Sequence, residues 1–192
     1  MDSKDVFAEY LSKRSSLEYE EIELVCSYFQ EEFLNKEIQL VVAGNIYKKI
    51  VFVVEGILRL FVIDNNGEEV VKNFIEPNCF FADIECLEKN QNSLINVSAV
   101  TDCVLFTLSK SDADNLIKIL PQWDYLMKVG ALQAMSDMIR KQEFLHIGDS
   151  AEQYQYLIKH FPLLIKQVPL KYIASYLRIT QSSLSRIRRQ TE

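Results

Sequence analysis

The sequence has few of the residues that build metal and catalytic centres. It contains two histidines and four cysteines, and no two cysteines have the CxxC spacing. Zinc and iron–sulfur sites need several such ligands close together, so neither is expected. The chain has only five glycines and no glycine-rich phosphate loop, and no Ser/His/Asp or Cys/His arrangement stands out. We therefore expect a protein that is not an enzyme, binds no metal and keeps its cysteines reduced.

Long apolar runs are missing as well. The most apolar stretch, residues 50–63, is interrupted by Glu55 and Arg59, whereas a membrane-spanning helix needs about 20 mostly apolar residues. The first ten residues, MDSKDVFAEY, lack the apolar segment of a signal peptide. The sequence predicts a cytoplasmic protein without a membrane partner.

Acidic residues are absent from one segment near the C-terminus. Residues 166–190 contain six basic residues and no acidic one, although the whole chain has a net charge of −6. The rest of the chain therefore carries −12. Such a division favours a polyanion-binding end, with nucleic acid as the expected partner, joined to an acidic body.

Between residues 38 and 108 the chain consists of short runs of β-branched and aromatic residues, separated by turn signals such as Asn66-Gly67. The six runs cover residues 38–42, 50–54, 57–63, 69–74, 95–100 and 103–108. Because no helical pattern lies between them, they predict an antiparallel sandwich or barrel rather than a doubly wound sheet. Asn66 and Gly67 both tolerate positive φ and predict a hairpin turn.

Helical patterns flank this block of strands. Apolar residues between positions 17 and 33 lie near helical spacing, and Ser16 is their expected N-cap. Ser109 is expected to cap a helix over residues 110–120, after which Pro121 begins a longer helix that ends near residue 146.

One face of the long helix has an apolar stripe with small residues at its centre. The stripe consists of Met127, Ala131, Ala134, Met138 and Leu145. It either packs on the chain's own core or forms a seam with a second copy. We favour self-association, because so long a helix extends beyond a small sandwich.

The basic end has the pattern of a helix-turn-helix. Gly148-Asp149 marks a break, and the four residues from Ser150 fit a capping box that opens a new helix. Two short helices follow over residues 170–177 and 181–190, with Thr180 as the cap of the second. The spacing directs Leu184 and Ile187 to the core. It leaves the second helix able to enter a DNA groove with five outward residues: Gln181, Ser182, Ser185, Arg186 and Arg189.

Together these features resemble the Crp/Fnr family of bacterial transcription regulators. The matching segments are the strand-rich block with VEGILRLF, the long helix and YIASYLRITQSSLSRIR. The resemblance implies an α+β chain in three parts. These are an antiparallel, jelly-roll-like β-roll sensor domain (1–120), a dimerisation helix (121–147) and an all-α helix-turn-helix DNA-binding domain (148–192). In the family the recognition helix pairs a Ser or Thr at its start with an Arg at mid-helix, which here are Thr180 and Arg186.

This assignment gives each polar residue of the segment an expected role. Arg186 has a planar guanidinium that suits the O6 and N7 atoms of guanine. The residues expected to contact bases are Gln181, Ser182, Ser185 and Arg186. Those expected to contact phosphates are Lys171, Arg178, Thr180, Ser183, Arg188 and Arg189. Arg178 stands in the turn, where the motif usually carries glycine because φ is positive, at a cost of about 1 kcal/mol.

The sensor half lacks one residue that its relatives use. Relatives that bind cyclic nucleotides hold the phosphate with a Gly-Glu pair and an Arg followed by Ser or Thr. The corresponding positions here, taken as the candidate effector pocket, are Ala82, Asp83, Ser93 and Leu94. Asp83 keeps a carboxylate for a ribose hydroxyl, but the phosphate-binding arginine is absent, and its loss costs about 1.5–3 kcal/mol. Cyclic nucleotide binding is therefore not expected. The roll binds another small molecule or serves as a scaffold, and Cys86 as a redox sensor is a further alternative.

The sequence thus predicts a homodimeric, sequence-specific DNA-binding regulator that does not respond to cyclic AMP and has no cofactor. Its two recognition helices would lie about 34 Å apart on double-stranded DNA. Any small-molecule effector would act through the long helix. The alternative is a ligand-binding β-roll whose C-terminal helices contact a protein, for instance RNA polymerase.

Overall fold

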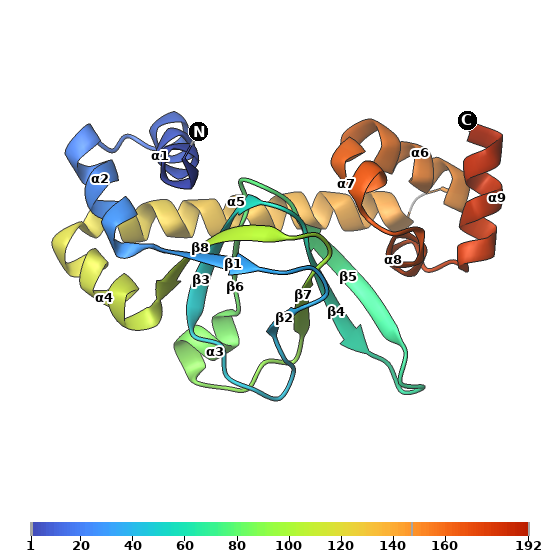
Figure 1. Cartoon of the computed structure of the whole chain (residues 1–192), viewed down its shortest axis with the longest axis horizontal. Helices are drawn as coiled ribbons and strands as arrows, with labels where there is room; N and C mark the ends of the chain where they lie inside the picture. Colours follow the sequence, from blue (N-terminus) through green and yellow to red (C-terminus); the bar gives the residue numbers. More distant parts are fainter. Residues whose placement is uncertain (1, 147, 192) are drawn as a thin grey trace.

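The protein consists of a two-sheet β-roll, a long helix beside it and helices at both ends. The structure, a computed structural model, describes residues 2–146 and 148–191, with the backbone alone described for residues 144–146 and 191. Figure 1 shows helix α5 running along the length of the molecule, with α1, α2 and α4 at one end and α6 to α9 at the other. Among the described residues, no helix is both long and apolar enough to span a membrane.

Two four-stranded antiparallel sheets form the roll. Their orders are β1-β8-β3-β6 and β2-β7-β4-β5. The strands are β1 (Gln30–Leu34), β2 (Gln39–Val41), β3 (Lys49–Glu55), β4 (Leu58–Ile63), β5 (Glu69–Ile75), β6 (Phe80–Ala82), β7 (Asn96–Ala99) and β8 (Cys103–Ser109). All six predicted runs are strands, and the predicted antiparallel sandwich or barrel is confirmed.

Strands β1 and β6 were not expected, and the helix predicted to reach Phe33 ends earlier. Helix α2 stops at Tyr28, and Gln30 to Leu34 pair with β8 instead. The exposed positions in β1 carry polar side chains and one exposed aromatic, Phe33. Pairing with a strand some 70 residues away in sequence outweighs the local helical spacing, because it satisfies the backbone of both strands.

The hairpin between β4 and β5 differs in detail from the prediction. Gly67 has a φ of 83°, but Asn66 does not adopt positive φ. The Gly67 N–H donates to the Asp64 carbonyl (3.0 Å), and the Asp64 N–H donates to the Glu68 carbonyl (2.9 Å). The turn is therefore one residue longer than a two-residue loop, and only the glycine takes the left-handed conformation.

Nine helices are described. They are α1 (Ser3–Arg14), α2 (Tyr19–Tyr28), α3 (Ile84–Lys89), α4 (Lys110–Ile119), α5 (Pro121–His146), α6 (Ser150–His160), α7 (Pro162–Gln167), α8 (Leu170–Tyr176) and α9 (Gln181–Thr191). The predicted Ser109 cap is confirmed, since its hydroxyl accepts from the Asp112 N–H at 3.1 Å. Helices α4, α5, α8 and α9 lie within one residue of their predicted positions.

Two predicted helix caps are wrong by one or two residues. The residue before α2 is Glu18, not Ser16, and its N–H donates to the Glu21 carboxylate at 2.9 Å. The cap of α6 is Asp149, one residue before Ser150; its carboxylate accepts from the Ala151 and Glu152 N–H groups. In both places a carboxylate replaces the expected hydroxyl, and it also interacts favourably with the helix dipole.

The core of the roll is closed by the N-terminal helices and by the start of α5. Phe7 of α1 lies between Phe29, Phe52 and Phe106, with ring centroids 4.7–5.5 Å apart. Trp123, at the start of α5, is fully buried in the same cluster. This buried tryptophan fixes the beginning of the long helix on the roll.

Candidate nucleic-acid interface and effector site

Helix α9 presents a polar and basic face to solvent. Gln181, Ser182 and Arg186 are exposed and Ser185 is half-buried, whereas Leu184 is completely buried. The predicted inward position of Leu184 is thus confirmed, and it anchors α9 against the other C-terminal helices. Burial of Leu184 sets the rotation of the helix, so Ser182 and Arg186 lie on its outer side. Gln181 is exposed in the first turn of α9, and Ser185 lies at the edge of the packed face.

The turn between α8 and α9 is closed by Arg178 in a left-handed conformation. Its φ is 57°, as the sequence analysis anticipated for this position. The Arg178 N–H donates to the Ser175 carbonyl (3.1 Å), and the Ile179 N–H donates to the Ala174 carbonyl (3.0 Å). These bonds end α8 sharply and fix the angle at which α9 leaves the turn. The Arg178 side chain is exposed.

The hydroxyl groups at the start of α9 are engaged with one another. The Thr180 Oγ accepts from the Ser183 N–H at 3.1 Å, so the predicted cap is confirmed. The Ser182 and Ser183 hydroxyls each lie 2.9 Å from the same Thr180 oxygen. Thr180 and Ser183 therefore order the helix start, and their predicted contacts to phosphates stay predictions.

The remaining basic side chains lie at the start of α8 and in the last turn of α9. Lys171, Arg188 and Arg189 are exposed. The Lys171 Nζ lies 4.5 Å from the centre of the Tyr172 ring, on α8. The exposed ammonium and guanidinium groups produce a positive surface on an otherwise acidic chain, as binding to a phosphate backbone requires.

In the roll, the four residues of the candidate effector pocket are used largely by the chain itself. The Asp83 carboxylate accepts from the Cys86 N–H at 3.3 Å and caps α3. The Ser93 N–H donates to the Asn45 carbonyl and the Ser93 carbonyl accepts from the Gly44 N–H, both at 2.8 Å. The Ser93 hydroxyl donates to the Ile95 carbonyl.

The other two residues of this pocket differ in exposure. Ala82 is half-buried at the end of β6, and Leu94 is 83% exposed. The Leu94 side chain therefore points away from the protein interior, and this side chain offers a bound anion no hydrogen-bond donor.

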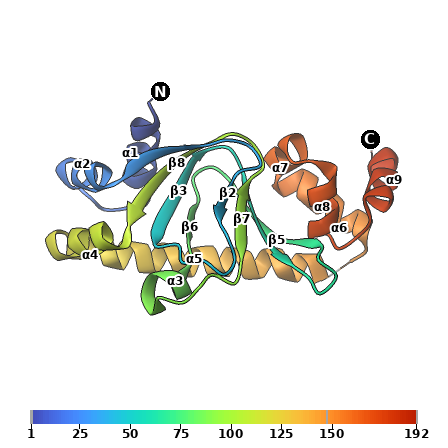
Figure 2. The same cartoon turned by 60° about the horizontal axis from the view of Figure 1, so that its bottom comes forward.

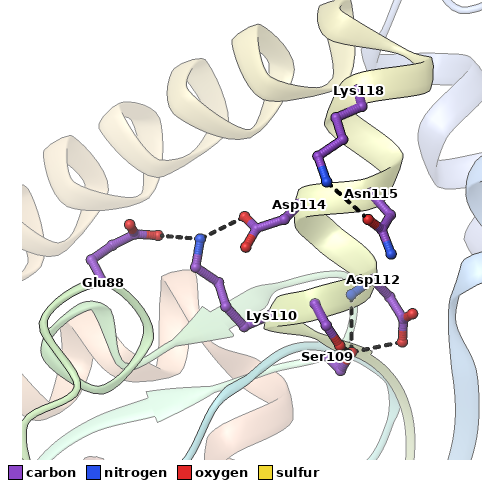
Figure 3. Close-up of polar contacts among 8 residues, drawn as sticks. Glu88, Ser109, Lys110, Asp112, Asp114, Asn115 and Lys118 are labelled. Atoms are coloured by element: carbon purple, nitrogen blue, oxygen red, sulfur yellow. Dashed lines mark hydrogen bonds and ion pairs between the residues drawn. The ribbon is translucent and has the colours of Figure 1, made fainter.

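Helix α3, next to these residues, is also held by an ion pair with α4. Figure 3 shows the Lys110 ammonium between Glu88 of α3 (3.2 Å) and Asp114 of α4 (2.6 Å). The hydrogen bond to Asp114 raises the pKa of Lys110, and Glu88 adds to this effect. The ammonium of Lys110 is thus already paired with one carboxylate of α3 and one of α4.

Three of the four thiols, those of Cys26, Cys86 and Cys103, are buried, and that of Cys79 is exposed. Cys86 is completely buried, and burial raises the pKa of its thiol, which disfavours the nucleophilic thiolate. No group of three or more His, Cys, Asp and Glu residues is placed to hold a metal ion among residues 2–146 and 148–191.

The long helix has a wider apolar face than the predicted stripe. Met127 packs against the core of the roll, whereas Ala131, Ala134 and Met138 are exposed; the Leu145 side chain lies outside the described residues. Further exposed apolar residues on this helix are Tyr125, Val129, Leu132, Met135 and Ile139. These residues lie outside the predicted stripe, which follows a single helical row. The hydrophobic pattern covers several rows.

Comparison with known proteins agrees with this geometry. Residues 31–119, from β1 to α4, match the model of the cyclic nucleotide-binding domain. These residues therefore resemble a cyclic nucleotide-binding domain. No curated protein matches the sequence.

Solved structures resemble more than this one domain. FixK2 from Bradyrhizobium japonicum is 16% identical, with a TM-score of 0.69 over 84% of this chain and 83% of its own. The c-di-GMP responsive global regulator CLP from Xanthomonas campestris is 14% identical, with a TM-score of 0.69 over 91% of both chains. The catabolite activator protein of Thermus thermophilus is 20% identical, with a TM-score of 0.58 over 91% and 84%.

These neighbours are Crp/Fnr regulators, and they confirm the predicted α+β fold. The cyclic nucleotide-binding domain, the long helix and the C-terminal helices follow one another in the order that the resemblance implied. At such low identity the likeness concerns the fold, and the role of each surface residue has to be argued from this chain.

Proposed function

We propose that the chain is a homodimeric regulator that binds double-stranded DNA through a helix-turn-helix formed by α8 and α9. The observation that carries the proposal is the outer face of α9, where Gln181, Ser182 and Arg186 are exposed above a buried Leu184. A helix of this kind fits the major groove, and an arginine at mid-helix can read guanine with two hydrogen bonds. The basic residues beside it supply contacts to phosphates.

A second copy of the chain is the proposed partner of α5. The exposed apolar residues between Tyr125 and Ile139 extend over about four helical turns. An apolar face of this length is costly in water, and a two-fold pairing of the same helix would bury it on both copies. Pairing along α5 would also relate the two α9 helices by the same two-fold axis.

No cyclic nucleotide is needed in this proposal. The position of the phosphate-binding arginine is taken by Ser93, whose hydroxyl and backbone already bond to other parts of the chain. Asp83 caps α3. The regulators CLP and catabolite activator protein share the fold, so regulation of transcription is the function that this arrangement supports best. We propose no catalytic activity.

Selection of bound duplexes from a random pool tests the proposal. We expect the selected duplexes to share a two-fold symmetric site. The logarithm of the binding constant should fall linearly with the logarithm of the salt concentration, with a slope of about −0.9 for each phosphate contacted. Sedimentation of the free protein should show a dimer. Cyclic AMP should change neither the selected site nor the affinity. A monomer that selects no duplex would refute the proposal and favour protein contacts through the C-terminal helices.

A further inference from the structure

The C-terminal helical unit, α6 to α9, does not hang free from the end of α5 but packs on the roll. One continuous apolar cluster contains residues of both parts. The roll contributes Ile57, Val71, Phe74 and Val100, and the helical unit contributes Tyr172 and Tyr176 among others. Phe74 and Tyr176 meet edge to face, with ring centroids 5.3 Å apart. Figures 1 and 2 both show α8 beside β5.

A buried guanidinium lies at the centre of this contact. Arg59 of β4 is 4% exposed, and its Cζ lies 4.1 Å from the centroids of two rings, Phe61 on its own strand and Tyr172 on α8. Its Nη1 donates to the Glu69 carboxylate at 2.5 Å. A desolvated cation between two aromatic faces is a strong and directional interaction. Arg59 therefore acts as a clamp between the sheet and the C-terminal helical unit.

Hydrogen bonds across the same contact fix its register. The Tyr172 hydroxyl donates to the Glu37 carboxylate at 2.9 Å. The Val71 N–H donates to the Ser175 hydroxyl at 3.0 Å, and this hydroxyl donates to the Glu69 carbonyl at 3.1 Å. The outer strand β5 thus gains a partner for its edge from α8. Such paired donors and acceptors specify one docked position rather than a sliding contact.

The docked position leaves the outer face of α9 uncovered. Tyr172, Ser175 and Tyr176 of α8 face the roll, whereas Gln181 and Arg186 of α9 remain exposed. In Figure 2, α9 lies at the far end of the molecule from the roll. Docking therefore does not mask the proposed DNA-reading face.

We propose that docking through Arg59 presets the DNA-binding arrangement, so that the dimer reads both halves of its site without an effector. This inference rests on the proposed function. A two-fold site requires both α9 helices at a fixed separation and orientation relative to the α5 pair. A unit held only by the connection around Gly148 would sample many orientations. The Arg59 clamp keeps the C-terminal helical unit in one orientation, so no cyclic nucleotide is needed to order this unit.

The test compares a two-fold symmetric duplex with a single half-site duplex, each bound by wild type and Arg59→Met. If the docked fraction of each unit falls from nearly all to about one tenth, both units are docked in only about one hundredth of the dimers. Affinity for the symmetric site then falls about a hundredfold. Affinity for the half-site should not change, because one undocked unit still reads it. Amide exchange at Val71 should accelerate, since its N–H bonds to Ser175 across the contact.

Two further variants complete the design. Arg14→Met is the matched control, because the Arg14 guanidinium also lies over a tyrosine ring, Tyr10 at 5.1 Å, but on α1 at the opposite end of the molecule. It should leave both affinities unchanged. Ser175→Ala removes two bonds that both cross the contact, and should lower symmetric-site affinity in the same direction even if Arg59→Met fails to fold.

The outcomes separate this inference from the proposed function. Faster exchange at Val71 with an unchanged ratio of symmetric-site to half-site affinity would overturn the inference and leave DNA binding intact. Tighter binding of the symmetric site by Arg59→Met would also overturn it, because docking would then be inhibitory. A wild type that binds neither duplex would remove the proposed function and this inference together.

Discussion

The two faces of the C-terminal helical unit use similar polar residues in opposite ways. On α8, Ser175 and Tyr172 direct their hydroxyls to atoms of the roll, so their hydrogen bonds are satisfied within the chain. On α9, Gln181 and Arg186 are exposed. Satisfied polar groups give a unit its position. Exposed ones on a rigid helix are available to a partner outside the chain.

The largest effect is expected at the exposed face. Replacing Arg186 by Ala should weaken binding of the preferred duplex by about 1–3 kcal/mol and relax base preference at one position. Arg188→Ala, on the same helix, is the matched comparison: it should weaken binding to all duplexes similarly and flatten the salt slope by about one. Titrations at several salt concentrations measure both. Equal losses of base preference in the two variants would contradict the assigned roles.

A smaller effect, on the free energy of unfolding, is expected when the pH is raised and Tyr176, on the α8 face that packs on the roll, ionises. Burial raises the pKa of Tyr176 to about 12, whereas an unfolded tyrosine titrates near pH 10. The folded pKa is the higher one, so this contribution to stability is complete below pH 10 and is lost as the pH rises toward 12. The free energy of unfolding should fall by about 1 kcal/mol at pH 11 from this group.

Urea unfolding between pH 8 and pH 11 measures this loss. Tyr176→Phe should remove that part of the pH dependence, because phenylalanine keeps the edge contact with Phe74 but cannot ionise. Tyr19→Phe is the control, since Tyr19 is 73% exposed. The same slope in wild type and Tyr176→Phe would show that the contact with Phe74 is not what opens at high pH.

The smallest effect is expected at the turn that joins the two faces. Arg178→Gly should raise the free energy of unfolding by up to about 1 kcal/mol, because glycine adopts the φ of 57° without strain. Arg178→Gly should also lower DNA affinity, because it removes a cation that is expected to contact a DNA phosphate. Arg178→Ala separates the two effects, since it loses the charge but keeps the strain. Thermal unfolding and salt titration together check the prediction.

Much of the fold was predictable because its signals are local. The six β-branched runs and the caps at Ser109 and Thr180 follow from residues adjacent in sequence, whereas the positive φ at Arg178 follows from the resemblance to the helix-turn-helix motif. Strands β1 and β6 were missed because their pairing partners lie far away along the chain. The burial of Met127 could not be read from the helix alone, since it depends on the roll beside it.

In the candidate site, too, local features were predictable and contacts between distant segments were not. The outward residues of α9 follow from helical periodicity, and their contacts to DNA stay predictions, as does the division of the chain at residues 120 and 147. The clamp was missed because an arginine within an apolar strand looks like an outward-facing charge. Only the fold brings Tyr172, more than 100 residues later, over the guanidinium of Arg59. No pattern along the chain indicates this pair.

The shared apolar cluster has a consequence for how such a chain could evolve. Exchange of the last 45 residues for those of another regulator would leave Ile57, Val71 and Phe74 facing water, unless the newcomer carried matching aromatics. A recombinant joined at Gly148 would therefore be less stable, because these apolar residues would lose their partners. If α9 binds DNA as proposed, a change of base preference is therefore reached more readily by point substitution on α9 than by exchange of the whole helical unit.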